Sequence, residues 1–539
     1  MATAVELLRQ GRRDELWKKY CGFLDLSLEE FMRIQKRLLL EQIQLLSNCE
    51  LGRKLLVGQK PTSVEEFRET VPLTTYEDYA PFLLKKREDV LPTKPLHWAR
   101  TTGRSGEFGY RFKWVPVSDA THHRSMRYGL AALILASCTK KGEVVLEEGD
   151  KFLYNAAPRP YASGESMYGL AREFPFKFLP PLDKAESLSF EERVQEGFKL
   201  AFRDGIDFFA GVSSVFVAVG ERFAEASRGI EFSPTLLHPK SLFRLGKALL
   251  KSKSAKRRML PKDLWTLKGV VGSGTDTAIY SHRIHYLWGK RPLGLYSATE
   301  AGFVAVQAWN YKGMTFVPDI NFFEFIPEEE HIRSKKDPQY RPRTLLLDQV
   351  KPGEKYEIVF TSLGGGCFVR YRIGDMIRIV SRRDEELGID IPQMQFESRC
   401  DDIIDLAAFT RLTETIIWRA IEDIGIPYQD WVVRKEEKDG QPALHIFIET
   451  KLDQRGQEKE IAEAMHQALK RLDPDYRDME EIMGLRPIVV TLLSPGTFHQ
   501  YYLERQAAEV DLGQLKPPHI QPPDRVLNAL LRISQKRSA

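Results

Sequence analysis

The chain has 539 residues, of which 42% are hydrophobic and 29% are charged. This composition is typical of a globular protein with a large core, and the length allows about two to four domains. The 79 basic and 75 acidic residues leave a formal net charge of +4. Such a small excess gives no reason to expect nucleic acid as a main partner, although a local basic patch could hold a polyanion.

Cysteine usage and apolar runs restrict the compartment. The five cysteines are scattered and form no close pairs, which favours reduced thiols over a disulfide framework or a zinc site; they are Cys21, Cys49, Cys138, Cys367 and Cys400. The longest apolar run, residues 130–136, is far shorter than the roughly 20 residues of a membrane span. Residues 5–17 carry charges where a secretory leader would be apolar. We therefore expect a cytoplasmic protein with no membrane partner.

Residues 1–60 predict a helical segment. Ser27 is placed to cap a helix, because apolar residues recur after it at near-helical spacing. A second helix start is expected a little further on. There Thr62 or Ser63 would be the cap, and Glu66 can close a capping box.

From about residue 100 to 395 the sequence alternates between short apolar runs of β type and helical stretches. Residues 151–154, 206–209 and 269–271 predict strands, and residues 212–223 predict a helix. This alternation favours an α/β fold in which helices cover the sheets. We assign residues 1–395 to one large N-terminal α/β domain with several sheets.

Past residue 396 the pattern changes. Residues 432–434, 444–448 and 488–493 predict three strands, and an amphipathic helix between the second and third carries Ile461, Met465 and Leu469. We therefore expect a small α+β domain over residues 403–539, with the boundary at 396–402.

A basic run occupies residues 251–258. We interpret it as a solvated loop, and a patch for a phosphate or a partner is the alternative.

Residues 101–109 combine three hydroxyl side chains, three glycines and an arginine. Glycine lets the backbone N–H groups of such a turn approach a phosphate closely. Lys113 follows and adds a cation. The P-loop spacing, with a lysine directly after the second glycine, is absent, so a hydrophilic surface loop is the alternative.

Two carboxylates and one aromatic side chain stand where a nucleotide could use them. Glu300 follows a predicted strand and suits magnesium, which takes few protein carboxylates and keeps phosphate and water ligands. A glutamate at a helix start, beside Ala301, is the alternative. Asp375 can accept both hydroxyls of a ribose, and a turn residue after a glycine is the alternative. Tyr296 could pack on a purine ring.

In their order and spacing, these segments resemble the adenylate-forming superfamily of acyl-CoA synthetases, peptide-synthetase adenylation domains and luciferases. Within it, they look most like the auxin-responsive Gretchen Hagen family of acyl acid–amido synthetases. Residues 71–79, 101–113, 296–300, 321–327 and 368–375 resemble successive motifs of that family in its N-terminal domain. Residues 496–498 and 514–518 are similar to its C-terminal segment, whose lysine reaches the phosphates. The resemblance covers about residues 65–520.

The resemblance implies ATP and Mg²⁺ as cofactors. It implies nucleotide binding by Thr101, Thr102, Gly103, Ser105, Lys113, Tyr296, Thr299, Asp375 and Arg399. It also implies catalytic roles for Lys516, Glu300 and Arg372, with Glu300 as the metal ligand.

Two departures from the family pattern bear on function. Arg104 stands where the family has a small hydroxyl residue, and matching Lys113 requires an insertion in the loop. Residues 399–405 and 411–414 look like the hinge of acyl-CoA synthetases, which places a hinge at Asp401 or Asp402. The acceptor of the acyl group is therefore an amine or a thiol.

The resemblance implies a ligase that adenylates a small carboxylic acid and transfers the acyl group to an amino acid, forming an amide. An acyl-CoA ligase with coenzyme A as acceptor is the alternative. A non-catalytic binding or scaffold protein is a third hypothesis, from another class. A small mobile C-terminal domain would close over the N-terminal one, and the acyl pocket would be built from residues 208–223 and 270–277.

Overall fold

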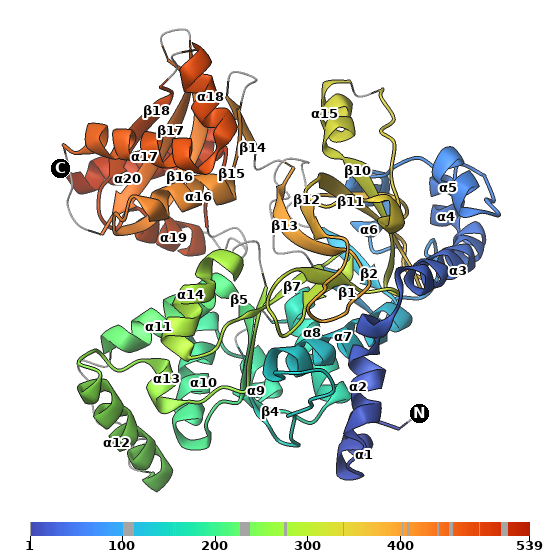
Figure 1. Ribbon diagram of the computed structural model, residues 1–539, viewed down its shortest axis with the longest axis horizontal. Helices are drawn as coiled ribbons and strands as arrows, with labels where there is room; N and C mark the ends of the chain where they lie inside the picture. Colours follow the sequence, from blue (N-terminus) through green and yellow to red (C-terminus); the bar gives the residue numbers. More distant parts are fainter. Residues whose placement is uncertain are drawn as a thin grey trace. The chain divides into compact units, whose positions relative to one another are not determined.

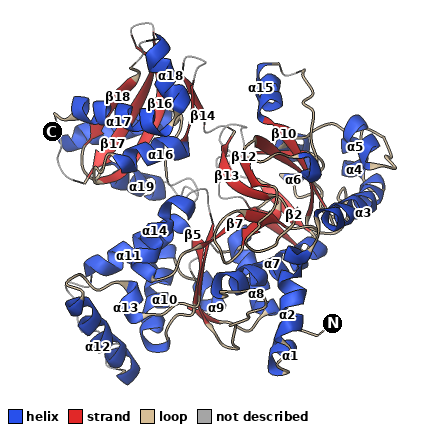
Figure 2. Ribbon diagram, viewed as in Figure 1, coloured by secondary structure: helices blue, strands red, loops and turns tan. Residues whose placement is uncertain are grey.

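The computed structural model describes residues 2–100, 113–154, 156, 158–226, 238–273, 277–337, 339–400, 403–406, 410–438, 441–451, 456–483, 486–507 and 516–538. These residues fall into two units. The first unit holds the described residues up to 396 except 374–376, and the second holds 374–376 and the described residues from 397 onward. Figures 1 and 2 show the helices and strands of each unit.

A mixed sheet is the main feature of the first unit. Across the described residues it has eleven strands in the order β10-β11-β12-β13-β9-β8-β7-β6-β5-β3-β4. In chain order the strands are β3 (Lys151–Leu153), β4 (Lys177–Leu179), β5 (Phe208–Val212), β6 (Gly269–Ser273), β7 (Leu293–Ala298), β8 (Gly302–Gln307), β9 (Met314–Phe316), β10 (Asn321–Pro327), β11 (Lys355–Ser362), β12 (Tyr371–Ser381) and β13 (Gln393–Arg399). A separate antiparallel ribbon pairs β1 (His97–Arg100) with β2 (Trp114–Val117).

Helices of the first unit pack on this sheet and beside it. They are α1 (Ala4–Arg9), α2 (Arg13–Cys21), α3 (Leu28–Ser47), α4 (Glu50–Leu55), α5 (Val64–Thr70), α6 (Tyr76–Leu83), α7 (Asp119–Ser137), α8 (Ala162–Glu173), α9 (Leu182–Glu186), α10 (Phe190–Asp204), α11 (Ser213–Ala226), α12 (Pro239–Ser254), α13 (Pro261–Leu264), α14 (Thr277–Trp288) and α15 (Glu328–Lys336). Two 3₁₀ turns, Gly22–Asp25 and Leu347–Gln349, complete the set.

The sheet has two halves with different pairing. Strands β3 to β7 are parallel, whereas β7, β8, β9 and β13 pair antiparallel, as do β10 and β11. In the parallel half Leu153, Phe209 and Val270 enter one core with α10, α11 and α14. Successive side chains of a strand point to opposite faces, so the neighbouring residues of these strands face α7, which packs on β6. Helices on both faces are the expected cover for a parallel sheet.

Two glutamines tie α3 to the sheet. The Gln35 amide donates to the Pro318 carbonyl oxygen at 2.9 Å, and its oxygen accepts from the Phe323 N–H at 3.0 Å. The Gln42 amide contacts a glycine turn in the same way, donating to the Gly366 carbonyl oxygen and accepting from the Gly365 N–H, both at 2.8 Å. Gly365 has φ +85°, and a Cβ there would lie 2.4 Å from Thr93. The turn before β12 is therefore held from the N-terminal helices.

The second unit contains a three-stranded sheet and a separate hairpin. Its elements are β14 (Ile403–Leu406), β15 (Thr410–Thr413), α16 (Glu414–Asp423), β16 (Tyr428–Lys438), β17 (Gln441–Thr450), α17 (Glu458–Leu472), α18 (Pro474–Met483), β18 (Ile488–Leu493), α19 (Thr497–Ala507) and α20 (Asp524–Ser538). Strand β17 pairs antiparallel with β16 and parallel with β18, so α17 and α18 form the crossover between β17 and β18.

Most sequence expectations for secondary structure are confirmed. Ser27 caps α3 and forms a capping box with Glu30. Ser63 caps α5, while the Glu66 carboxylate accepts from Thr62 instead. The three predicted C-terminal strands are β16, β17 and β18. Helix α17 buries Ile461, Met465 and Leu469 as its spacing predicts. The fold class, a large α/β part followed by a smaller α+β part, is also confirmed.

One predicted strand starts later than expected, and one local prediction is wrong. The strand predicted at 206–209 is β5, which begins at Phe208. Asp207 precedes it, with its N–H donating to the Lys151 carbonyl oxygen at 2.9 Å and its carboxylate accepting from the Lys151 N–H at 2.8 Å. The basic run at 251–258 is not a loop throughout. Its first four residues are the last turn of α12, because Ser252 continues the buried face of that helix.

All five cysteines are buried and free. Within the described residues, no helix combines the length and apolar character needed to cross a membrane.

Candidate active site

Lys113 joins three segments that are distant in the sequence. Its Nζ lies 3.2 Å from Glu300 Oε1 and 3.2 Å from the Tyr371 hydroxyl. The ammonium also lies 5.2 Å from the centre of the Tyr76 ring. The Tyr76 hydroxyl is 2.8 Å from both the N–H and the carbonyl oxygen of Trp114, donating to the oxygen and accepting from the N–H. Tyr76 therefore fixes the backbone next to Lys113 and provides an aromatic face for the cation.

Glu300 lies in the turn between β7 and β8. The helix-start alternative for this residue is therefore wrong. Its side chain is 8% exposed, and its ion pair with Lys113 offsets part of the cost of burying the carboxylate. Gly302 ends the turn with φ +64°, and a Cβ there would lie 2.9 Å from Ser125 Oγ. The Asn321 amide donates to the Ala301 carbonyl oxygen at 2.7 Å and holds the turn from β10.

A buried ion-pair cluster fixes the start of β12. The fully buried Glu324 carboxylate accepts from Arg370 Nε at 3.0 Å and from Arg370 Nη2 at 2.8 Å. Thr344 donates to the same carboxylate at 2.7 Å, and Arg68 Nε lies 3.5 Å from it. A bidentate pair with further donors is the arrangement in which a buried charge is tolerated. We name Glu324, Arg370, Thr344 and Arg68 the Glu324 cluster.

Arg370 directly precedes Tyr371 and adopts left-handed backbone geometry, with φ +42°. On either side of Tyr371, the Thr74 N–H donates to the Arg370 carbonyl oxygen at 3.0 Å and the Arg372 N–H donates to the Thr74 carbonyl oxygen at 2.8 Å. Segment 71–79, which sequence analysis matched to a family motif, therefore pairs with the β12 motif. Together these contacts set the position of the Tyr371 hydroxyl beside Lys113.

The structure places Arg372 in a different cluster. Its guanidinium donates to Glu357 Oε1 at 2.8 Å and to Oε2 at 2.6 Å, and His331 Nδ1 lies 2.6 Å from Oε2. Burial alone would raise the pKa of Glu357, but Arg372 and His331 outweigh it and hold the pKa below its usual range. Adjacent residues of a strand point to opposite faces, so Arg372 points away from the face on which Tyr371 meets Lys113.

The remaining predicted residues are placed as follows. Tyr296 is buried in β7, with its ring centre 5.7 Å from that of Phe396. Thr299 precedes Glu300 in the same turn and is half-buried. Asp375 is buried in β12, and Arg399 is the last residue of β13. Thr101, Thr102, Gly103, Ser105, Asp401 and Asp402 lie outside the described residues.

Lys516 is exposed and lies in the second unit. Three residues further on is His519, whose two ring nitrogens each contact a carboxylate. His519 Nδ1 lies 2.6 Å from Glu414 Oε1, and Nε2 lies 2.9 Å from Asp430 Oδ1. The imidazole stacks on Trp431 at 4.4 Å between ring centres. Burial alone would lower the pKa of His519, but the two carboxylates outweigh it and raise the pKa to about 9.

The backbone of this segment is also fixed. The Val433 N–H donates to the His519 carbonyl oxygen at 2.7 Å, and the Gln521 N–H donates to the Val433 carbonyl oxygen at 2.8 Å. Lys516 is close enough to Asp430 to help lower the pKa of that carboxyl, after the larger effect of the His519 charge. Burial alone would raise it. Sequence analysis singled out Lys516 and missed its anchor, although His519 follows two prolines in the same segment.

The region predicted to form an acyl pocket lies at the carboxyl ends of β5 and β6. Ser213 Oγ and Thr277 Oγ1 there are 2.8 Å apart. Parallel α/β sheets bind ligands beyond such strand ends. Phe209 and Phe216, however, belong to the core, with ring centres 4.2 Å apart. The pocket assignment stays a prediction.

Comparisons with known proteins give first a class of fold and then a family. The fold is that of an acyl acid amido synthetase, AtGH3.15 in complex with 2,4-DB, with a TM-score of 0.68, 18% identity and 96% of each chain covered. It is also similar to a 2-hydroxyisobutyryl-CoA ligase in the postadenylation state, with a TM-score of 0.61, 15% identity and 95% and 93% of the two chains covered.

The family follows from the sequence profiles. Residues 22–164 match the GH3 family N-terminal domain, residues 314–399 the central domain and residues 417–524 the C-terminal domain. Together the matches cover more than half of the chain, and the protein belongs to the GH3 family. This is the Gretchen Hagen family that the sequence motifs resembled.

A similar protein is the probable indole-3-acetic acid-amido synthetase GH3.4 of Oryza sativa subsp. japonica. It is 24% identical over 404 residues, which are 64% of this chain and 62% of the relative. The matches span between 34% and 64% of the length of the first three such relatives.

Proposed function

We propose that this protein is an ATP-dependent ligase that adenylates a small carboxylic acid and transfers the acyl group to an amino acid, forming an amide. The observation that carries the proposal is the contact of Lys113 with both Glu300 and Tyr371, because it joins three of the motifs that mark the family. In the first half-reaction a carboxylate oxygen attacks the α-phosphorus of ATP and pyrophosphate leaves. In the second the amine nitrogen attacks the acyl carbon and AMP leaves.

Charge neutralisation is the main task of a site for phosphoryl chemistry. In the proposal Lys113, together with Thr101, Thr102, Gly103 and Ser105, binds the phosphates. Asp375 accepts the ribose hydroxyls, and Tyr296 and Thr299 line the nucleotide. Arg399 also binds the nucleotide, and Arg372 has a catalytic role. Arg372 would reach a nucleotide only by leaving Glu357.

The surroundings of Glu300 fit a magnesium ion that binds together with the nucleotide. One carboxylate oxygen of Glu300 contacts Lys113, and the Glu300 side chain is largely buried. Magnesium usually takes one or two protein carboxylates and completes its shell with phosphate and water. A carboxylate beside a lysine therefore suits a magnesium ion that arrives with the nucleotide. Bound there, magnesium would neutralise charge on the phosphates.

The domain roles belong to the proposal as well. Residues 1–395 would bind ATP and the acid, residues 396–402 would act as the hinge at Asp401 or Asp402, and residues 403–539 would act as a lid carrying Lys516. The His519 network supports this role for Lys516, because it fixes the backbone three residues away on two partly buried carboxylates. A pre-positioned cation loses little orientational freedom when it meets a phosphate.

Lys516→Ala tests the lid. It should slow acyl-AMP formation by about 10²–10³-fold, the typical loss when one preorganised charge-stabilising group is removed. Amide formation from presynthesised acyl-AMP should change little. Lys459→Ala, an exposed lysine on α17, is the matched control. An equal loss in both half-reactions, or in neither, would contradict the role.

An acyl-CoA ligase is the second candidate, favoured by the fold similarity to 2-hydroxyisobutyryl-CoA ligase. The two candidates share the first half-reaction and differ in the acceptor. The enzyme should be supplied with ATP, magnesium, an acid that supports exchange and an equimolar mixture of amino acids and coenzyme A. Mass analysis of the products should find an amide. A thioester as the main product would replace the amide proposal with the ligase alternative.

A further inference from the structure

Helix α12 has an unusual charge composition. Its 16 residues include five basic side chains, Lys240, Arg244, Lys247, Lys251 and Lys253, and no acidic one. One face is buried in the first unit through Ser241, Leu245, Ala248 and Ser252. The spacing of these four, i, i+4, i+7 and i+11, defines a single helical stripe. The other side chains of the helix are exposed, apart from the half-buried Arg244. The helix lies at the edge of the first unit (Figure 1).

Part of that outward surface is apolar. Phe243 is 74% exposed, Leu250 72%, Leu242 43% and Leu249 42%. Phe243 and Leu250 form one i, i+7 row along the helix axis, and Leu242 and Leu249 form a second row about 100° around the helix from it. Single exposed apolar side chains are ordinary, but four large ones on one short helix mark an interaction surface. We name the row of Phe243 and Leu250 the apolar stripe.

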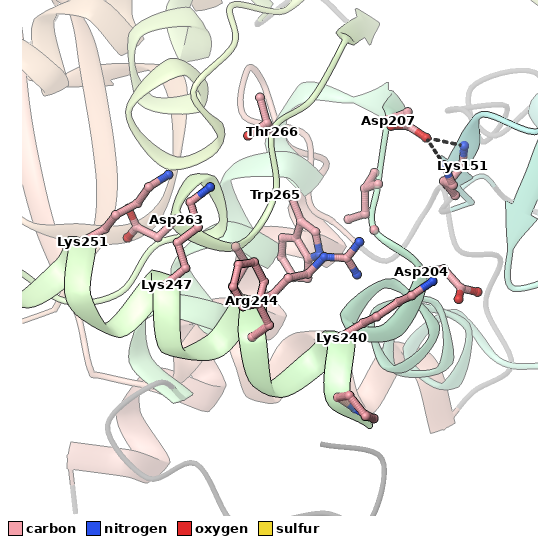
Figure 3. Close-up of a pocket in the computed structure, with 15 residues that line it drawn as sticks. Lys151, Asp204, Asp207, Lys240, Arg244, Lys247, Lys251, Asp263, Trp265 and Thr266 are labelled. Atoms are coloured by element: carbon pink, nitrogen blue, oxygen red, sulfur yellow. Dashed lines mark hydrogen bonds and ion pairs between the residues drawn. The ribbon is translucent and has the colours of Figure 1, made fainter. Parts of the chain in front are cut away.

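Next to the apolar stripe runs a basic stripe formed by Lys240, Lys247 and Lys251. These side chains line a cavity of about 600 Å³ together with Arg244 and Trp265 (Figure 3). No ion pair to the three lysines occurs within the described part of the chain. Arg244 differs, because its Nη1 donates to the Phe202 and Arg203 carbonyl oxygens at the end of α10, at 3.0 and 2.7 Å.

The carboxylates of the same cavity are already paired. Asp204 lies 2.9 Å from Lys177, Asp207 lies 3.1 Å from Lys151, and Asp263 lies 2.7 Å from Arg257. The charge of the three lysines is therefore uncompensated. The exposed Lys256 extends the basic surface past the end of the helix.

We propose that α12 docks the protein reversibly on a lipid bilayer that contains anionic headgroups. A helix with parallel basic and apolar stripes matches an anionic bilayer, which offers phosphates and apolar depth along one plane. The lysines contact phosphate oxygens, and Phe243 and Leu250 enter the acyl boundary. The expectation of no membrane partner came from the lack of an apolar run long enough to span a bilayer, which does not bear on a helix that lies on its surface. The proposal is independent of the catalytic function.

Vesicle co-sedimentation of the full chain tests it, with vesicles of phosphatidylcholine alone and of equimolar phosphatidylcholine and phosphatidylserine. The protein should sediment with the anionic vesicles only, and added salt should release it. Replacing Lys240, Lys247 and Lys251 together with Gln should weaken binding about fivefold per lysine and about a hundredfold in all. The matched control replaces the exposed Lys18, Lys60 and Lys85 with Gln and should bind as the wild type does.

A second variant, Phe243→Ser with Leu250→Ser, separates the two stripes. It should lower binding to anionic vesicles while leaving the salt dependence in place. Equal sedimentation with both vesicle types, or normal binding of the triple Lys→Gln variant, would overturn the proposal. A dimer in light scattering that the Phe243→Ser, Leu250→Ser variant abolishes, without vesicle binding, would assign α12 to a second copy of the chain. Retention on an acidic polypeptide but on no vesicle would assign it to a protein partner.

Discussion

Glu324 and Glu300 are both largely buried carboxylates of the first unit, and both are paired with a cation. They differ in how many donors contact each carboxylate, and therefore in whether it can still bind a ligand. Glu324 is 0% exposed and receives donors from Arg370, Thr344 and Arg68. Glu300 is 8% exposed, and within the described residues its ion pair is to one flexible lysine, Lys113. A carboxylate saturated by arginine in a bidentate geometry serves the fold, whereas one held by a single lysine can exchange that partner for a ligand.

The comparison predicts opposite effects on stability and activity. The strongest expected effect is on folding. Glu324→Gln leaves Arg370 buried without its counter-charge, and breaking such a pair typically costs about 3–5 kcal/mol. Urea denaturation should show a loss of this size. A loss below about 0.5 kcal/mol, the range of ordinary surface substitutions, would mean that the cluster does not anchor β12.

Glu300→Gln should affect catalysis more than folding. It keeps the shape of the side chain and removes the charge opposite Lys113, so ATP–pyrophosphate exchange should fall about 10²–10³-fold. Excess magnesium should restore part of the rate. Glu329→Gln, on the exposed face of α15, is the control. Near-normal exchange at ordinary magnesium would remove Glu300 from the site.

The His519 network adds a third case, in which the contribution of an ion pair to stability depends on pH. An unperturbed histidine has a pKa of about 6.5, and the folded value is about 9. Because the folded value is the higher one, the stabilisation is fully present below about pH 6.5 and is lost as pH rises through about 9. Its size is on the order of 3 kcal/mol.

The stability gap between the wild type and His519→Gln should therefore shrink between about pH 6 and about pH 9.5. Urea denaturation of both proteins at the two pH values measures this gap. A gap that stays constant would show that His519 is not held as an imidazolium by Asp430 and Glu414.

The smallest predicted effect is that of Asp375→Ala. A charge-assisted hydrogen bond contributes about 1.5–3 kcal/mol, so ATP binding should weaken by roughly ten- to a hundredfold with folding intact. Nucleotide titration of the purified variant measures it. An unchanged dissociation constant in a folded protein would exclude Asp375 from ribose binding.

Local periodicity predicted much of the fold, because it depends on residues close in sequence. The spacing of Ile461, Met465 and Leu469 places them on one face of a helix, and α17 buries all three. Residues 251–258 were predicted to be a loop, but the first four belong to α12, which begins at Pro239. The helix was missed because two of its four buried residues are serines, so its buried face has no continuous apolar pattern. The contact of Lys113 with Glu300 joins residues 187 positions apart. Spacing in the sequence cannot provide such a pair, since it depends on the strand order of the assembled sheet.

The motifs are local in the sequence, whereas the residues that hold them in place are distant from them. Sequence analysis selected residues 321–327 as a family match without a reason for the glutamate inside that apolar run. The structure supplies the reason, because Glu324 holds Arg370 and thereby the start of β12. In the same way Lys516 was selected and His519 was not, because the two carboxylates that hold His519 lie 89 and 105 residues away.

The central claim is that this protein activates a carboxylic acid with ATP, and acid-dependent ATP–pyrophosphate exchange tests it most directly. The wild-type protein should be assayed with magnesium and a panel of small carboxylic acids, without amine or thiol. The account predicts exchange that requires an acid, needs no acceptor and is strongly reduced in Glu300→Gln. A folded protein that binds ATP but exchanges pyrophosphate with no acid of the panel would contradict it and favour a non-catalytic binding role.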